Sequence, residues 1–130
     1  MKASKDLHSL LKQLNPKLHN NTYCYVFSPE ANEKYSTASF CVVNEKEGVT
    51  YIMPQEKADA LGLHYSFIGK LITLQVFSDL EAIGLTMAVS TTLTKAGIPC
   101  NVIAGYHHDH IVVPEKKAEQ AMQLLNSLSA

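Results

Sequence analysis

Residues 111–119 read IVVPEKKAE, and much of the architecture follows from this stretch. Its apolar start is typical of a β-strand, and the proline opens a helix, since proline suits the first helical position. Residues 51–59, at an offset of 60 positions, read YIMPQEKAD and repeat the order of strand, proline and helix. The same offset pairs Val42-Val43 with Val102-Ile103. We therefore interpret the chain as two halves that share a strand, turn, strand and helix.

The second half is predicted to contain a strand, a helix, two strands and a last helix. These elements are strand 71–77 (LITLQVF), a helix capped by Ser78 or Asp79 and closed by Gly97, strands 100–104 and 110–113, and a helix after Pro114. This order indicates an α+β, ferredoxin-like layer, with helices mainly on one face of an antiparallel sheet. The fourth strand that such a layer needs is expected from residues 23–28 of the first half.

The first half is predicted to begin with a helix over residues 4–14, with Ser4 as its N-cap and Asn15-Pro16 as its end. Strands are expected at 23–28, 37–44 and 48–53, with a polar loop at 29–34, a hairpin turn ending at Gly48, and a short helix after Pro54. We place the division between the halves at 69/70, which gives residues 1–69 and 70–130.

The charge balance argues against nucleic acid as a partner. The 130 residues contain 11 basic and 12 acidic side chains, and the net charge is −1. No basic surplus is present to neutralise phosphates. All the basic residues are lysines. An anion would therefore be held by Lys, by backbone N–H groups or by a helix N-terminus, because the guanidinium fork of arginine is missing.

The cysteines and the first residues indicate a cytoplasmic protein. Cys24, Cys41 and Cys100 are odd in number and widely spaced, which is typical of free thiols in a reducing compartment. The N-terminal residues lack the apolar run of a signal peptide. No apolar stretch approaches the roughly 18 residues that a membrane helix needs.

Residues 71–128 resemble an ACT domain, the small ligand-binding module attached to aspartate kinases and other amino-acid enzymes. The whole chain resembles short bacterial stand-alone proteins with two ACT-like halves, although the first half lacks a Gly-Leu helix start. The matching features are LITLQVF, Gly84-Leu85, Val89-Ser90, Leu93, Ala96-Gly97-Ile98, Asn101-Val102-Ile103, Ile111-Val112-Val113-Pro114, Ala118 and Ala121.

The resemblance implies a non-catalytic regulatory module without a cofactor, which senses a free amino acid at an inter-domain or inter-subunit interface. Carried onto this sequence, the ligand site would comprise Ser78, Asp79, Leu80, Ile83, Gly84, Leu85, Asn101, Val102 and Ile103. The helix N-terminus would receive the carboxylate of the amino acid, and Asp79 its ammonium group. Gly84 and Asp79 also have purely structural interpretations, as a packing glycine and a helix cap.

Residues 106–110, YHHDH, leave an enzyme as the alternative. His107, His108 and His110 with Asp109 could bind a divalent metal, although so short a run supplies few converging ligands. A Cys100 nucleophile lacks an orienting third group. A pure interaction module is the third interpretation. Because sheet edges invite pairing with another copy, we predict a homodimer.

Overall fold

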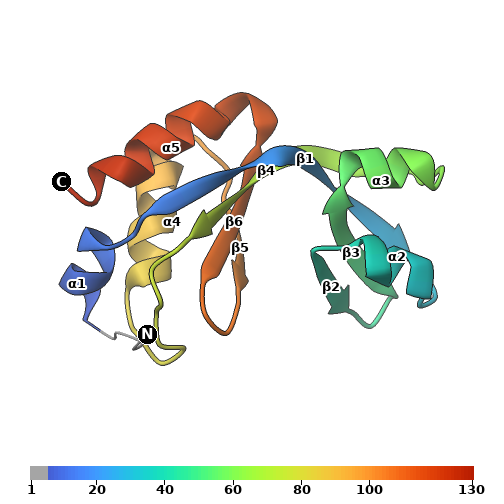
Figure 1. Cartoon of the computed structure of the whole chain (residues 1–130), viewed down its shortest axis with the longest axis horizontal. Coiled ribbons are helices and arrows are strands. Elements are labelled where there is room, and N and C mark those ends of the chain that lie inside the picture. Colours follow the sequence, from blue (N-terminus) through green and yellow to red (C-terminus); the bar gives the residue numbers. More distant parts are fainter. Residues whose placement is uncertain (1–5) are drawn as a thin grey trace. The chain divides into compact units, whose positions relative to one another are not determined.

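The computed structural model describes residues 6–130 (Figure 1). In chain order the elements are α1 (Leu7–Lys12), β1 (Pro16–Ser28), α2 (Glu33–Ala38), β2 (Cys41–Asn44), β3 (Val49–Pro54), α3 (Gln55–Ala60), β4 (Ser66–Leu74), α4 (Leu85–Lys95), β5 (Asn101–Ala104), β6 (Asp109–Pro114), a 3-10 turn (Glu115–Lys117) and α5 (Ala118–Ser127). Neighbouring strands hydrogen-bond in the order β2-β3-β1-β4-β6-β5. The antiparallel hairpins and the helices make this an α+β, ferredoxin-like fold.

The chain forms two compact units. The larger unit contains Lys70–Ala130 and the described residues up to His19, and the smaller unit contains Asn20–Gly69. The division of the sequence into halves at 69/70 stays a prediction. In the structure the described residues before Asn20 belong to the larger unit, so the smaller unit is inserted between two segments of the larger one in sequence. The long strands β1 and β4 each contribute residues to both units.

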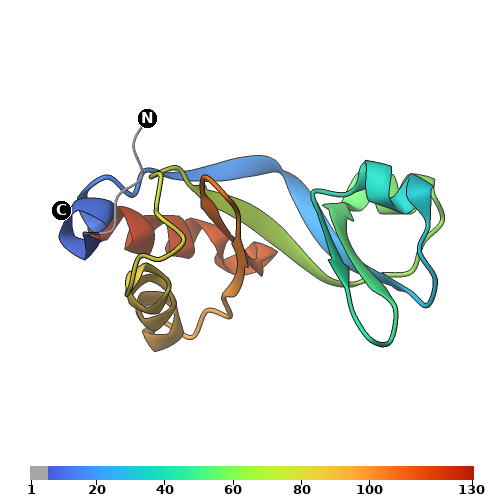
Figure 2. The ribbon, with the colours of Figure 1, turned by 90° about the horizontal axis from the view of Figure 1, so that it is seen from below.

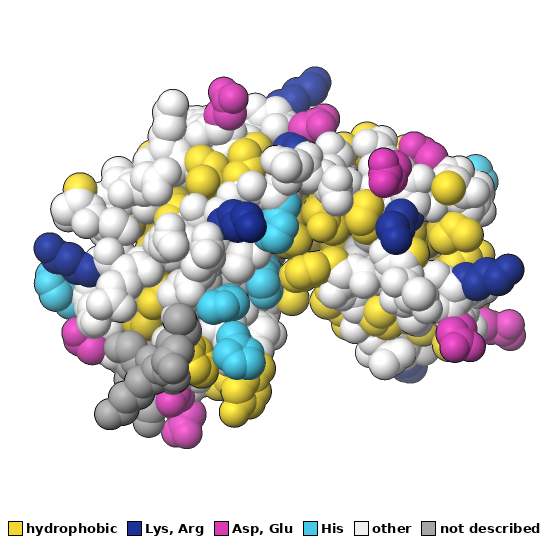
Figure 3. All heavy atoms as spheres, in the orientation of Figure 1, with side chains coloured by type: hydrophobic (Ala, Val, Ile, Leu, Met, Phe, Trp, Pro, Cys, Tyr) yellow, Lys and Arg dark blue, Asp and Glu magenta, His cyan; other side chains and the backbone are white. Residues whose placement is uncertain are grey.

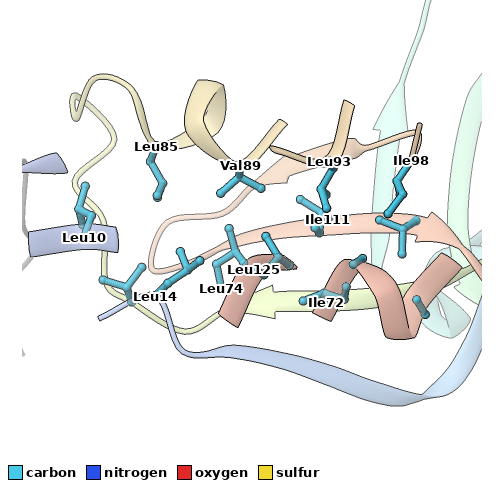
Figure 4. Close-up of a cluster of buried hydrophobic side chains, with 14 residues drawn as sticks. Leu10, Leu14, Ile72, Leu74, Leu85, Val89, Leu93, Ile98, Ile111 and Leu125 are labelled. Atoms are coloured by element: carbon cyan, nitrogen blue, oxygen red, sulfur yellow. The ribbon is translucent and has the colours of Figure 1, made fainter. Parts of the chain in front are cut away.

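The larger unit packs its helices on one face of its strands (Figure 2). Apolar residues spaced three or four apart on α4 and α5 bury a stripe against alternate residues of β4 and β6. The resulting core contains Leu10, Leu14, Ile72, Leu74, Val76, Leu85, Val89, Leu93, Ile98, Ile111, Val113, Ala118, Ala121 and Leu125 (Figure 4). This core holds the start of α4 against the end of the β5–β6 hairpin.

The smaller unit has its own core, made of Cys24, Val26, Val49, Tyr51, Met53 and Ala58. Strand β3 lies between β2 and β1, with Val26 opposite Tyr51 and Ser28 opposite Val49. Tyr35 of α2 meets the ring of Tyr51 edge to face, with centroids 5.6 Å apart. The helix side of this sheet is therefore filled by aromatic and aliphatic side chains.

The repeat seen in the sequence is present in the backbone. Val42 pairs with Tyr51 in one hairpin, and Val102 pairs with Ile111 in the other, at the offset already seen in the sequence. The turn bond from the Glu45 N–H to the Gly48 carbonyl, at 2.8 Å, recurs from Gly105 to His108 at 3.0 Å. The two hairpins are thus equivalent residue by residue.

Several predicted boundaries in the first half are wrong. Residues 33–38 form α2 where a loop and the start of a strand were expected, because the Asn32 side chain accepts a hydrogen bond from the Tyr35 N–H and caps a helix. Strand β2 is correspondingly shorter than 37–44, and β1 begins at Pro16. The expected helix cap Ser4 lies outside the described residues, and α1 is capped by Asp6.

The fourth strand of the larger unit does come from β1, but not from the predicted residues. Residues 23–28 pair with β3 inside the smaller unit. The first residues of β1, Pro16–His19, belong to the larger unit and lie beside β4 in the strand order. The prediction failed because the sequence pattern gave no sign that β1 extends so far toward the N-terminus.

Candidate functional site

The loop between β4 and α4 meets the end of the β5–β6 hairpin at a cavity of about 170 Å³. The cavity is lined by Ser78, Asp79, Leu80, Ala82, Gly84, Leu85, Thr86, Ala104 and Asp109. A second depression of about 200 Å³ shares Ser78, Asp79 and Leu80 and is bounded by Phe77, Glu81 and Tyr106.

The start of α4 forms one wall of the cavity. Gly84 is the N-cap with φ of +102°, and a Cβ there would lie 3.1 Å from Leu7 Cδ2. Helical hydrogen bonding begins with the bond from the Ala88 N–H to the Gly84 carbonyl, at 2.9 Å. The first N–H groups of a helix have no acceptor within it and carry its positive dipole end, so this wall favours a negatively charged group.

The expectation that Ser78 or Asp79 caps the long helix is wrong, because α4 begins only at Leu85. Asp79 instead caps a local turn, in which its Oδ1 accepts a hydrogen bond of 2.8 Å from the Glu81 N–H. The Asp79 carbonyl accepts a second bond from the Ala82 N–H. Residues 79–82 are thereby held as a defined turn at the rim of the cavity.

Asp109 forms the opposite wall and was missed as a cavity residue by the sequence analysis. Its carboxylate is half-buried, and burial raises its pKa above the usual range, while a hydrogen bond from the buried Ser78 hydroxyl acts in the opposite direction. Alternation along β6 could have located it, since Asp109 shares a face with Ile111 and Val113 of the helix-side core. The pattern was interpreted as part of a histidine turn instead.

The structure brings together five of the nine predicted site residues. Ser78, Asp79, Leu80, Gly84 and Leu85 line the cavity, whereas Ile83 is 86% exposed and is not part of the lining. Asn101, Val102 and Ile103 also lie outside it, because the other end of β5, at Ala104, reaches the cavity. The Asn101 amide donates a hydrogen bond to the Val112 carbonyl instead.

A second polar group spans the strands of the larger unit. Thr73 Oγ1 lies 2.7 Å from His19 Nε2 and 2.8 Å from His110 Nδ1. Burial lowers the pKa of both histidines, with further lowering by Lys17 at His19 and by His108 and His19 at His110. Figure 3 shows histidine side chains gathered on one face of this unit.

Residues 106–110 do not converge as metal ligands. His108 Nδ1 lies 3.3 Å from the Val76 carbonyl, and the His107 ring packs against Phe77 with centroids 5.1 Å apart. Within residues 6–130, no group of three or more His, Cys, Asp or Glu side chains is placed to hold a metal ion. Residues 106–110 are adjacent in sequence but do not share a metal site, because the side chains of Asp109 and His110 lie on opposite faces of β6.

The three cysteines are free thiols. Burial raises the pKa of Cys41 and Cys100, and raises that of Cys24 to about 11. A raised pKa disfavours the thiolate, which is the nucleophilic form. The environment of these thiols therefore works against nucleophilic chemistry at neutral pH.

No helix within residues 6–130 has the length and apolar character needed to cross a membrane.

Comparison with known proteins identifies the family. ACT domain family models match residues 2–70 and residues 68–127. A search of curated proteins returned no match.

Solved structures share the fold. A Vibrio cholerae protein of unknown function, described as a possible transport protein, is 41% identical, with a TM-score of 0.86 over 97% of this chain and 98% of that one. An Agrobacterium tumefaciens protein is 16% identical, with a TM-score of 0.73 over 88% and 87% of the two chains. The regulatory subunit of aspartate kinase from Thermus flavus is 8% identical, with a TM-score of 0.63 over 88% of this chain and 97% of that one. Because one family match alone spans more than half of the 130 residues, and a second covers the C-terminal half, the chain belongs to the ACT domain family.

Proposed function

We propose that this protein is a small regulatory module that binds a free amino acid in the cavity between the β4–α4 loop and the β5–β6 hairpin. ACT domains are typically amino-acid-binding regulatory modules. The observation that supports this site most directly is the cavity at the start of α4, which five of the residues implied by the family resemblance line. Its volume of about 170 Å³ lies below the roughly 300 Å³ of pockets for drug-sized ligands, which favours a small ligand.

The chemistry of the walls fits an amino acid. The N–H groups at the start of α4 would bind the carboxylate of the amino acid. Backbone donors are needed for this role because all the basic residues are lysines and no arginine is present to form a bidentate contact. Two acidic side chains of the lining, Asp79 and Asp109, are available for the ammonium group. Asn101, Val102 and Ile103 lie on β5, the last strand in the order, and would contribute to a ligand site from a second copy of the chain.

The homodimer belongs to this proposal. Leu80, Ile83, Met87 and Tyr106 lie on the β4–α4 loop, on α4 and on the β5–β6 turn, and are 66–86% exposed. Leu80 and Tyr106 line one depression, and large exposed apolar side chains of this kind are typical of an interaction surface. The proposed role is regulatory rather than catalytic, in the cytoplasm, and needs neither nucleic acid nor a membrane.

Light scattering at micromolar concentration should return about twice the monomer mass of 14.3 kDa. Ile83→Asp should shift the protein toward the monomer, because a carboxylate would be desolvated in the contact. Leu61→Asp, at an exposed position of the smaller unit, is the control and should leave the mass unchanged. A monomer mass for the unaltered chain would contradict the proposed homodimer.

A thermal-shift screen tests the proposed function. We expect at least one of the twenty L-amino acids to raise the melting temperature, since a ligand present at 100 times its Kd adds about 2.7 kcal/mol to the free energy of unfolding. The parallel arm contains divalent metal ions. Stabilisation by a metal alone would favour the alternative, a metal- or histidine-dependent enzyme using residues 106–110, and stabilisation by neither would favour a pure interaction module.

A further inference from the structure

Asp109 is a half-buried carboxylate without a cationic partner inside the described part of the chain. Its side chain accepts a hydrogen bond from Ser78, and within residues 6–130 the effects that shift its pKa are burial and this bond, with no cationic group among them. Removing a carboxylate from water is unfavourable unless an opposite charge or several hydrogen bonds compensate. One hydroxyl donor gives only part of that compensation. The missing part points to a cation that binds from the cavity that Asp109 lines.

The cavity places this carboxylate across from a positive wall. The start of α4, at Gly84, Leu85 and Thr86, lines the same cavity and carries the positive end of an eleven-residue helix. A ligand with a single charge would satisfy only one wall. A zwitterion with a carboxylate and an ammonium group would satisfy both, which matches the backbone end of a free amino acid.

Asp109 is better placed for the ammonium group than Asp79, the other acidic residue of the lining. The Asp79 carboxylate already closes the turn at residues 79–82 by accepting from the Glu81 N–H. Asp109 has the Ser78 hydroxyl as its hydrogen-bond donor and keeps acceptor capacity for a ligand. Changing Asp109 to asparagine would therefore remove the charge that faces the ligand, whereas the same change at Asp79 would act on a carboxylate that closes a turn.

The equivalent hairpin of the smaller unit lacks these features. At the sequence offset that relates the two hairpins, Asp109 corresponds to the buried Val49, and Ile111 corresponds to Tyr51. The Tyr51 hydroxyl accepts a hydrogen bond of 2.9 Å from the Asn32 N–H, at the start of α2. In the smaller unit the apolar Val49 therefore stands where the larger unit has the Asp109 carboxylate. The start of α2, which corresponds to the start of α4, is occupied by the Tyr51 side chain.

We propose that Asp109 binds the ammonium group of the ligand, and that the larger unit alone holds such a site, so that each chain binds one amino acid. This inference rests on the proposed function for the identity of the ligand. The part that concerns Asp109 rests only on a half-buried carboxylate facing a cavity.

Calorimetric titration of the full chain tests the inference, with the amino acid that gives the largest thermal shift among the twenty. We expect one ligand per chain, and a 10- to 100-fold loss of affinity in Asp109→Asn, about the contribution of a charge-assisted hydrogen bond. Glu119→Gln, the same carboxylate-to-amide change at an exposed position of α5 outside the cavity, is the matched control and should leave the affinity unchanged. Asp79→Asn compares the two carboxylates of the lining, and a loss there as large as in Asp109→Asn would contradict the preference for Asp109. Asp109→Glu keeps the charge and should retain more affinity than Asp109→Asn.

Unchanged affinity in Asp109→Asn would overturn the ammonium assignment, and two ligands per chain would overturn the assignment of a single site. Propylammonium chloride, followed by the carboxyl NMR signal of Asp109, is an independent probe that needs only the unaltered protein. If no amino acid binds, the proposed function fails, and this probe still decides the inference. A saturable shift at Asp109 supports the ammonium site, and no shift overturns it.

Discussion

Leu93→Ala is expected to lower the free energy of unfolding by about 3 kcal/mol, within the roughly 2–5 kcal/mol range for truncating a buried leucine. Leu93 is fully buried on α4, and Figure 4 shows it directed into the core beside Ile111. The change removes apolar contacts and leaves a cavity that the surrounding strands and helix α5 fill only in part. The expected loss is large because α4 packs against its unit through a single stripe of buried residues, of which Leu93 is one.

Urea unfolding followed by circular dichroism measures this loss. Lys95→Ala is the control, because it lies on the same helix with an exposed side chain outside the proposed dimer surface and should change stability by less than about 0.5 kcal/mol. Equal effects of the two substitutions would contradict the packing described for α4.

Gly48→Ala is expected to destabilise the protein by about 2–5 kcal/mol, the sum of backbone strain and overpacking. Gly48 has φ of +153°, and a Cβ built there lies 2.4 Å from the Ser28 carbonyl oxygen and 2.9 Å from Pro29 Cα. Both neighbours are backbone atoms, so they cannot move aside as a side chain would. The clash falls at the end of β1, where Ser28 pairs with Val49.

Gly62→Ala separates strain from crowding. Gly62 has φ of +68°, but a Cβ there would meet open space. Its cost should therefore be close to the roughly 1–2 kcal/mol of a left-handed residue alone. The same urea titration measures both variants. If the free energy of unfolding falls no further in Gly48→Ala than in Gly62→Ala, the Gly48 Cα does not lie as close to the Ser28 carbonyl as described.

The elements that the sequence predicted well are those with strong local signals. The strand, proline and helix order at 51–59 and 111–119 predicts β3, α3, β6 and α5, because proline and apolar periodicity act over a few residues. The constant offset between these two stretches predicted the repeat, and the register of the two hairpins follows it. The ferredoxin-like layer followed from this order without any knowledge of long-range contacts.

The remaining elements depend on contacts that a local pattern does not contain. Helix α2 forms because Asn32 caps it and because Tyr35 packs against Tyr51, which belongs to a strand on the other side of the β2–β3 turn. Five of the nine lining residues were predicted, all from the loop before α4 and the first residue of that helix, whereas Asp109 comes from the β5–β6 hairpin, which the chain reaches only after α4. The sequence marked Asp109 as polar among histidines, and only the fold shows that it faces Ser78.

The hydroxyl of Thr73 has one proton and two imidazole neighbours, which couples the tautomers of two histidines. When Thr73 donates to His19 Nε2, it accepts from His110 Nδ1, and both neutral rings then carry their proton on Nδ1. When the hydroxyl turns to donate to His110 Nδ1, both rings carry it on Nε2. In the mixed tautomers the two nitrogens are either two acceptors, of which one is left without a donor, or two donors, both of which the hydroxyl accepts only when its own proton turns to a third group. A rotation of one side chain on β4 is thus tied to the proton positions on β1 and β6, the strands on either side of it.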